Sequence, residues 1–197
     1  MQDPRARGRR TLLIVAAIFF LPVIAAFALY YGQLWRPSGS SSKGELITPA
    51  RPLQIAGLRN IDGTPAAPGV FADKWTLIYI GDGACDADCR NALVFGRQSR
   101  LSLNNEMTRV QRVFLATGHC CANAYFAAEH AGMIALDASS PAAEKLLGQF
   151  PADRAQSLFI VDPLGNLMMR HDAGAAVQTS KDLLTDLKKL LKLSHIG

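Results

Sequence analysis

The distribution of apolar and polar residues divides the chain into a long uncharged N-terminal stretch and a region of shorter apolar segments. Residues 11–31 contain no charged side chain. A stretch of this length is sufficient for a helix to cross a bilayer core about 30 Å thick. Further along, residues 75–80 are apolar or aromatic apart from Thr76. This pattern is typical of a strand buried on both faces, and it predicts the central strand of a folded domain.

The residues that flank the uncharged stretch indicate a membrane anchor. Arginines are concentrated in residues 1–10, and Tyr30, Tyr31 and Trp35 lie at the other end. Basic residues stay on the cytoplasmic side and aromatic residues gather at the interface, so the N-terminus is expected in the cytoplasm. A cleaved signal peptide is the alternative, but its apolar region would span only about 7–15 residues. The rest of the chain is then extracytoplasmic, where disulfides form.

Composition suggests four consecutive parts. These are a basic cytoplasmic tail at 1–10, a transmembrane helix at 11–31, a flexible linker at 32–45 and a folded domain at 46–197. The linker contains the sequence PSGSSSKG, which is polar and rich in serine and glycine. A length of 197 residues suits one domain with an appendage.

The folded part shows short apolar segments that alternate between strand and helix patterns. Strands are expected at residues 53–61, 75–80, 110–116, 133–136, 158–161 and 166–170, and helices at residues 90–103, 122–131, 141–150 and from a cap at Ser180 onward. Asp62-Gly63 marks a hairpin turn after the first strand. A hairpin, a strand–helix–strand unit, a second hairpin and a closing helix predict an α/β, thioredoxin-like fold, with a central mixed sheet flanked by helices.

Two cysteines follow the central strand. Cys85 and Cys89 come after a glycine-containing loop and are four residues apart, a spacing that places both on one face of a helix. Ligands of such sheets gather beyond the carboxyl ends of the strands, where this pair falls. Cys85 is expected to be the attacking thiol, because the N-terminus of a helix lowers the pKa of a thiol, and Cys89 the resolving thiol.

A second cysteine pair, Cys120 and Cys121, lies beside His119 after strand 110–116. Right-handed crossover predicts that this strand is parallel and adjacent to strand 75–80, so the two pairs are expected within about 15 Å of each other. The second pair is then a candidate redox relay; alternatively, it only packs the loop. Adjacent cysteines form a strained ring, so a bond between them is the pairing least expected, and both pairs are expected to be reduced.

The sequence WTLIYIGDGACDADC at 75–89 resembles the Sco/SenC family of cytochrome oxidase copper-insertion proteins, and the likeness continues at 107–115 and 158–165. The resemblance implies a thioredoxin-like domain anchored in a bacterial inner membrane, with its folded part in the periplasm. It also implies copper as the metal. The partner would be a subunit of cytochrome c oxidase or another copper or thiol assembly factor.

The resemblance fails at the third copper ligand. The family histidine aligns with Arg154, which offers no lone pair. Cu(I) is soft and accepts two thiolates, so weak binding through Cys85 and Cys89 is expected. His171 and His119 are the candidates for a substitute third ligand.

Two functions of different classes follow. The first is an assembly factor that exchanges disulfides or handles copper, and so a candidate thiol–disulfide oxidoreductase. The second is a membrane-tethered binding module that has kept the fold and lost the chemistry. A peroxidase is disfavoured, because Asp82 replaces the threonine expected three residues before the reactive cysteine. Nucleic-acid binding is disfavoured, since residues 1–10 carry most of the net charge of +5.

Overall fold

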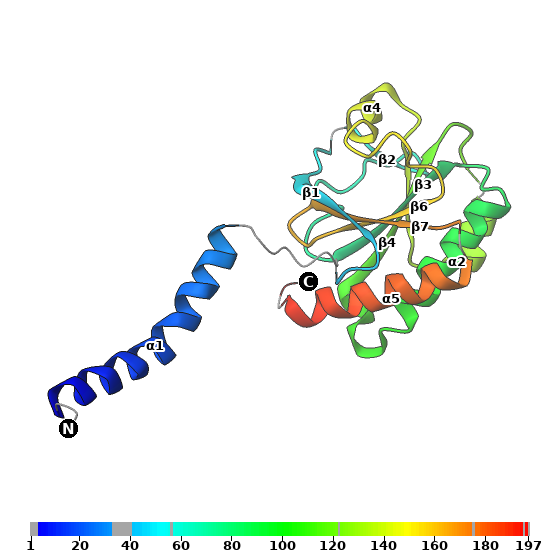
Figure 1. Cartoon of the computed structure of the whole chain (residues 1–197). Coiled ribbons are helices and arrows are strands. Elements are labelled where there is room, and N and C mark those ends of the chain that lie inside the picture. The colour runs from blue at the N-terminus through cyan, green and yellow to red at the C-terminus, as the bar shows by residue number, and fades with distance from the viewer. Residues whose placement is uncertain are drawn as a thin grey trace. The chain divides into compact units, whose positions relative to one another are not determined.

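The computed structural model describes residues 4–32, 41–55, 57–121, 123–174, 176–194 and 196 (Figure 1). The chain forms two compact units, Met1–Ser41 and Ser42–Gly197. The described residues of the first unit form one helix, and the second unit contains the folded domain. Each unit is described by itself.

Helix α1 (Pro4–Tyr31) forms the first unit. Its segment Gly8–Tyr31 has a mean hydropathy of 2.9 and exposes apolar side chains along its whole length. At 1.5 Å per residue these 24 residues extend about 36 Å, enough to cross a bilayer. The predicted apolar helix is confirmed, and it begins before residue 11. Most of the expected linker falls on residues 33–40, which lie outside the described residues.

The folded domain is built on a mixed sheet of seven strands. The strands are β1 (Glu45–Pro52), β2 (Arg59–Asn60), β3 (Trp75–Asp82), β4 (Val110–Thr117), β5 (Ile134–Asp137), β6 (Ser157–Val161) and β7 (Asn166–Asp172). Their order is β1-β7-β6-β3-β4-β5-β2, with β3–β4 and β4–β5 parallel and the other pairs antiparallel. The predicted α/β, thioredoxin-like sheet is confirmed.

Helices cover both faces of this sheet (Figure 1). They are α2 (Ala87–Leu101), α3 (Asn123–Glu129), α4 (Pro141–Leu147) and α5 (Ala176–Leu193), with a 3-10 helix at Asn104–Arg109. Side chains of β3 alternate between the two faces: Leu77 and Tyr79 pack with α2 and α5, whereas Ile78 and Ile80 pack with α4. Burial on both faces explains why the β3 sequence lacks polar alternation.

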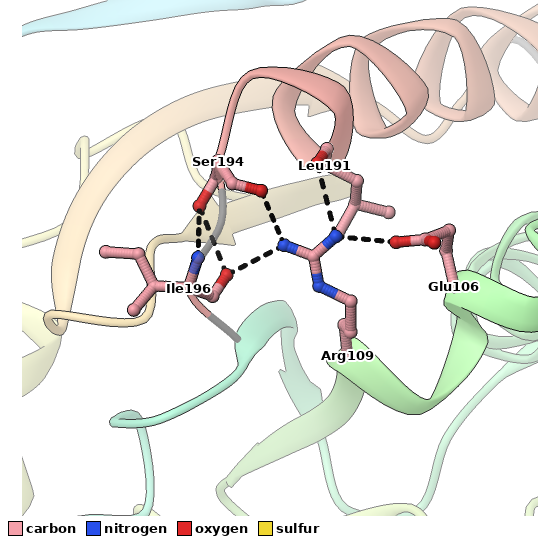
Figure 2. A network of polar contacts seen from close by, with 5 residues as sticks. All are labelled: Glu106, Arg109, Leu191, Ser194 and Ile196. Carbon is pink, nitrogen blue, oxygen red and sulfur yellow. Dashed lines mark hydrogen bonds and ion pairs between the residues drawn. The ribbon is translucent and has the colours of Figure 1, made fainter.

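The C-terminal end of α5 is bound by a single arginine (Figure 2). The guanidinium of Arg109 donates to the carbonyl oxygens of Leu191, Ser194 and Ile196 at 3.2, 2.7 and 2.9 Å, and pairs with Glu106. The last carbonyls of a helix lack partners within the helix and carry partial negative charge, so a cation there is favourable. This contact fixes the end of α5 against the segment that leads into β4.

The start of the domain differs from the prediction. The strand expected at 53–61 is wrong except for β2, and β1, which was not predicted, pairs with β7 at the edge of the sheet. β1 is mostly exposed and contains Pro49 and Pro52, so it lacks the alternation that marks a half-buried strand. Proline is tolerated at a sheet edge because no neighbour needs its amide. Within the expected strand, Gly57 adopts φ +67°, which interrupts an extended chain.

The helix boundaries differ by a few residues. Ser180 was expected to cap the last helix, and this is wrong: α5 begins at Ala176, so Ser180 lies inside it. There Ser180 contacts α2, because the Ser99 hydroxyl lies 3.3 Å from both its carbonyl and its hydroxyl oxygen. Helix α2 begins earlier than predicted because Asp86 caps it.

The packing of α5 on α2 yields a stability prediction. Leu187 is fully buried, whereas Leu193 on the same helix is 81% exposed. Replacing Leu187 with alanine should destabilise the folded domain by about 2–5 kcal/mol, because burial is lost and a cavity remains. Leu193→Ala should change stability by less than about 0.5 kcal/mol. Urea unfolding of the full chain in detergent measures both, and equal effects would contradict this packing.

Candidate functional site

The first cysteine pair lies where β3 passes into α2. Asp86 caps α2 by accepting the amide hydrogen of Cys89 at 2.9 Å. Cys85 adopts φ +50°, a left-handed conformation that costs about 1–3 kcal/mol outside glycine. Two hydrogen bonds hold it there: its amide donates to the Asp82 carbonyl at 3.0 Å, and Arg90 Nε donates to its carbonyl at 3.1 Å.

Cys85 and Cys89 form a disulfide. The pair was expected to be reduced, and this is wrong: the Cα atoms lie 5.1 Å apart, within the range that a disulfide spans. Both residues are buried, with 1% and 3% of their surface exposed. They belong to the hydrophobic cluster between the sheet and the α2–α5 layer. The sulfur atoms are therefore shielded from solvent.

Cys120 and Cys121 are also joined by a disulfide. This bond was the pairing least expected, and the expectation is wrong. The two Cα atoms lie 3.1 Å apart because the residues are neighbours in the chain. Cys120 is exposed, whereas Cys121 is half-buried and packs against the cluster that contains the first pair.

The loops that carry the two disulfides contact each other. β3 and β4 are parallel as predicted, with Asp82 opposite Thr117. The amide of Gly83 donates to the Thr117 carbonyl at 3.2 Å. A methyl group added to Gly83 would overlap the carbonyl oxygen of His119 and would lie 2.8 Å from the Cα atom of Cys120. Glycine is required here because the two backbones approach so closely.

The two candidate histidines occupy different environments. The His119 side chain is 95% exposed, with Nδ1 3.5 Å from the Asp82 carboxylate. That carboxylate accepts the Ala84 amide hydrogen, which, together with the contact to His119, lowers the pKa of Asp82. His171 is buried on β7, and its Nε2 lies 3.4 Å from the carboxylate of Asp186 on α5.

The structure groups neither histidine with the first cysteine pair as a metal centre. Asp186, the neighbour of His171, also accepts the amide hydrogens of Lys43 and Gly44, at 2.7 and 2.8 Å. His171 is thus paired with α5 and the segment that enters β1. Among the described residues, no three His, Cys, Asp or Glu side chains are arranged to hold a metal ion.

Gln156 contacts the helix that carries Cys89, and the sequence analysis did not single it out as a site residue. It adopts φ +51° just before β6, and its amide nitrogen donates to Asp88 in the first turn of α2 at 2.6 Å. Its carbonyl accepts the amide hydrogen of Ala173 at 2.6 Å. Arg154, the position aligned with the family histidine, instead donates to the Leu147 carbonyl at the end of α4. The polar residue directly before a buried strand was the available signal.

A chain of polar side chains extends inward from the first cysteine pair. The guanidinium carbon of Arg90 lies 4.8 Å from the ring centre of Tyr125 on α3. The hydroxyl of Tyr125 is 2.9 Å from His130 Nε2, and His130 Nδ1 is 3.3 Å from Arg112 of β4. Burial lowers the pKa of Arg112 to about 10, so it stays protonated at neutral pH. In the sequence, Arg112 showed only as a polar position within an apolar strand.

The tyrosine beneath the first cysteine pair stays protonated. Tyr79 on β3 is buried in the same cluster as Cys85 and Cys89. Burial, reinforced by the negative charges of Asp86 and Asp88, raises its pKa to about 12. The same two carboxylates oppose negative charge near the start of α2, whereas the helix N-terminus favours it.

Two buried histidines predict how stability depends on pH. Burial lowers the pKa of His130 and of His171 below the ordinary value of 6.5. Since the unfolded chain binds these protons more readily, their stabilising contribution is present above about pH 6.5 and is lost as the pH falls below it. The urea midpoint should therefore fall between about pH 7.5 and about pH 5.5, and less so in His130→Gln/His171→Gln.

The control for this pH effect is His119→Gln, because His119 is exposed. This variant should keep the pH dependence of the unmodified chain. A pH profile that is unchanged in the double variant would contradict the assignment to the buried pair.

Comparison with known proteins places the chain in a family. Residues 75–194 match the family described as "Transmembrane-like, thioredoxin-like, C-terminal domain", and residues 2–33 match "Transmembrane-like, N-terminal domain". The search of curated proteins gives no significant match.

Several solved structures share the fold. Apo Sco1 from Thermus thermophilus is 20% identical with a TM-score of 0.63, covering 78% of this chain and 99% of its own. Yeast Sco1 with copper bound is 17% identical with a TM-score of 0.53, covering 78% of this chain and 95% of its own. BsSco is 14% identical with a TM-score of 0.54, covering 74% of this chain and 96% of its own. Its structure is described as identifying a disulfide switch in a member of the Sco family of cytochrome c oxidase assembly proteins.

The predicted resemblance to Sco/SenC proteins is thus confirmed in the fold. The matches cover the apolar N-terminal helix and most of the folded domain. The chain belongs to the family that combines a transmembrane-like N-terminal domain with a thioredoxin-like C-terminal domain.

Proposed function

We propose that this protein is a membrane-anchored thiol–disulfide exchange protein that assists the assembly of cytochrome c oxidase. The observation that carries the proposal is the Cys85–Cys89 disulfide at the carboxyl end of β3, the edge where ligands of such sheets gather. The anchor is helix α1, and the folded domain lies on the periplasmic side of a bacterial inner membrane. The arginines before the apolar stretch support this orientation.

The redox chemistry is carried by the first cysteine pair. In the reduced state Cys85 and Cys89 flank the capped N-terminus of α2, whose dipole favours a thiolate. One thiolate attacks the disulfide of a partner protein and forms a mixed disulfide. The other thiol then resolves it, which leaves the partner reduced and this pair oxidised. Asp86 and Asp88 temper the reaction by opposing the thiolate charge.

The partner is a subunit of cytochrome c oxidase or another copper or thiol assembly factor. The support is the shared fold with BsSco, a protein described as belonging to a family of oxidase assembly proteins.

The protein is expected to bind copper only weakly. When reduced, Cys85 and Cys89 offer two thiolates, which suit Cu(I). His119 and His171 remain candidates for a third ligand, although His171 is paired with Asp186 and the described residues contain no grouped metal-binding set. Weak Cu(I) binding and little Cu(II) binding are therefore expected.

Copper titration of the reduced full chain under anaerobic conditions tests this expectation. Cu(I) binding should disappear in Cys85→Ser, which removes one of the two soft ligands. Arg154→His, which restores an imidazole at the family position, should raise Cu(II) affinity. The matched control is Lys145→His, which adds a histidine on the exposed side of α4. If Arg154→His and Lys145→His behave alike while His171→Ala abolishes binding, the assignment of Arg154 to the ligand position is wrong.

The second candidate function is a tethered binding module without redox chemistry. The burial of the first disulfide and the absence of a grouped metal-binding set among the described residues favour it. The two functions differ in whether the thiols are needed, and assembly of the oxidase in cells can distinguish them.

Replacing both Cys85 and Cys89 with serine should lower oxidase activity in membranes by about tenfold or more, because the exchange step loses both sulfur atoms. The measurement is oxidase turnover per membrane protein in cells whose own copy is replaced, with the level of the variant chain checked by immunoblot. The matched control is Ser99→Ala, a buried substitution of similar size on α2 that leaves the cysteines in place. Full activity of the double serine variant would support the binding module instead.

A further inference from the structure

We propose that the exposed Cys120–Cys121 disulfide is the point of access through which an external dithiol exchanges electrons with the buried Cys85–Cys89 disulfide. This inference rests on the proposed thiol–disulfide function and assigns an order to its steps. The second pair reacts first and the first pair second. These exchanges return Cys85 and Cys89 to the reduced state from which they attack the partner disulfide.

The difference in exposure between the two pairs is the first argument. A thiolate must approach a disulfide sulfur directly to displace its partner, so the rate depends on access. Cys85 and Cys89 are 1% and 3% exposed, and both pack within the cluster beneath α2. Cys120 is exposed. In the folded domain the second pair is therefore more accessible to an external thiolate than the first.

The contact between the two loops is the second argument. Gly83 and the His119–Cys120 backbone lie so close that a methyl group at Gly83 would overlap them. Cys121 packs against the cluster that holds Cys85 and Cys89. The second pair thus has one residue that is exposed and one that packs against the cluster containing the buried disulfide, as a relay requires.

Contacts on both sides of the second pair hold this arrangement in place. Before the pair, the ring of His119 lies 3.5 Å from the Asp82 carboxylate of the first loop. After it, Tyr125 of α3 lies against the guanidinium of Arg90, which also binds the Cys85 carbonyl. The loop of the second pair thus contacts the first loop, and the helix that follows it contacts α2.

The relay is a sequence of two balanced disulfide exchanges. A thiolate of the external dithiol attacks Cys120 Sγ and displaces the Cys121 thiolate; its second thiol then releases Cys120 and leaves as a disulfide. The Cys121 thiolate next attacks the Cys85–Cys89 bond and forms a mixed disulfide with one of these two cysteines. Cys120 then attacks the Cys121 sulfur of this mixed disulfide and displaces the cysteine of the first pair as a thiolate. Cys120–Cys121 is thereby restored, and Cys85 and Cys89 have gained two electrons and two protons from the external dithiol.

Time-resolved reduction of the oxidised full chain in detergent, quenched with acid, tests the order of the steps. With limiting dithiothreitol, acid quenching and alkylation, mass mapping should label Cys120 and Cys121 before Cys85 and Cys89. In Cys120→Ser/Cys121→Ser, reduction of the buried pair should slow by about tenfold or more, because it must then await local opening of α2. Equal rates in the variant and the unmodified chain would overturn the relay.

Two further variants separate the relay from its alternatives. Cys85→Ser/Cys89→Ser should leave reduction of the exposed pair at its original rate, since that step comes first. If this variant also retains oxidase assembly, the proposed function fails while the relay order stands. Suppose that assembly requires the first pair, but that the buried disulfide is reduced in Cys120→Ser/Cys121→Ser as fast as in the unmodified chain. In that case the relay alone fails.

A trapping experiment covers the case in which removal of the second pair loosens the fold. Cys89→Ser/Cys120→Ser keeps only Cys85 and Cys121, and mild oxidation should join them within the chain. Cys89→Ser/Cys121→Ser keeps Cys85 and Cys120, and should give less of this product because Cys120 faces solvent. Absence of any intramolecular bond in the first variant would overturn the relay.

Discussion

The parallel pairing of β3 with β4 is the constraint on which the rest of the domain depends. Parallel strands in register end at the same edge of a sheet, so the loops after Asp82 and Thr117 must leave the sheet together. The first loop carries Cys85, which is bonded to Cys89 of α2, and the second carries Cys120 and Cys121. Because β3 is buried on both faces, with one hydrophobic cluster on each side, this pairing also fixes the centre of the core.

The candidate site is built mainly from backbone contacts and burial. Gly83 lets one loop backbone lie directly on the other, and the left-handed conformations of Cys85 and Gln156 are held by hydrogen bonds from neighbouring segments. The contact between His119 and Asp82 is exposed, and surface contacts of this kind contribute little stability. The site therefore relies on the packing of α2 and α3 rather than on surface charge.

Polar groups inside the domain connect the sheet to its covering layers. Arg112 of β4 binds His130, which in turn contacts Tyr125 of α3. On the same face of the sheet, His171 of β7 lies beside Asp186 of α5. Buried polar groups are costly unless they are paired, so the contacts from Arg112 through His130 to Tyr125 restrict how α3 packs on the sheet. His171, which the sequence offers as a metal ligand, instead lies against Asp186.

The sequence by itself determined the elements whose burial is expressed locally. The stretch at 11–31 and the segment at 75–80 are continuously apolar, and four leucines of the last helix repeat at helical spacing: Leu183, Leu187, Leu190 and Leu191. Such local patterns allowed the thioredoxin-like order of strands and helices to be predicted. The placement of Cys85 and Cys89 after the central strand followed from that order. The tertiary structure alone decided what depends on segments far apart in the chain. β1 is an exposed edge strand that exists because β7 offers a partner, and Asp186, the partner of His171, lies on α5. The exposure of each cysteine pair depends on which helix packs over it, and this packing cannot be predicted from the local sequence.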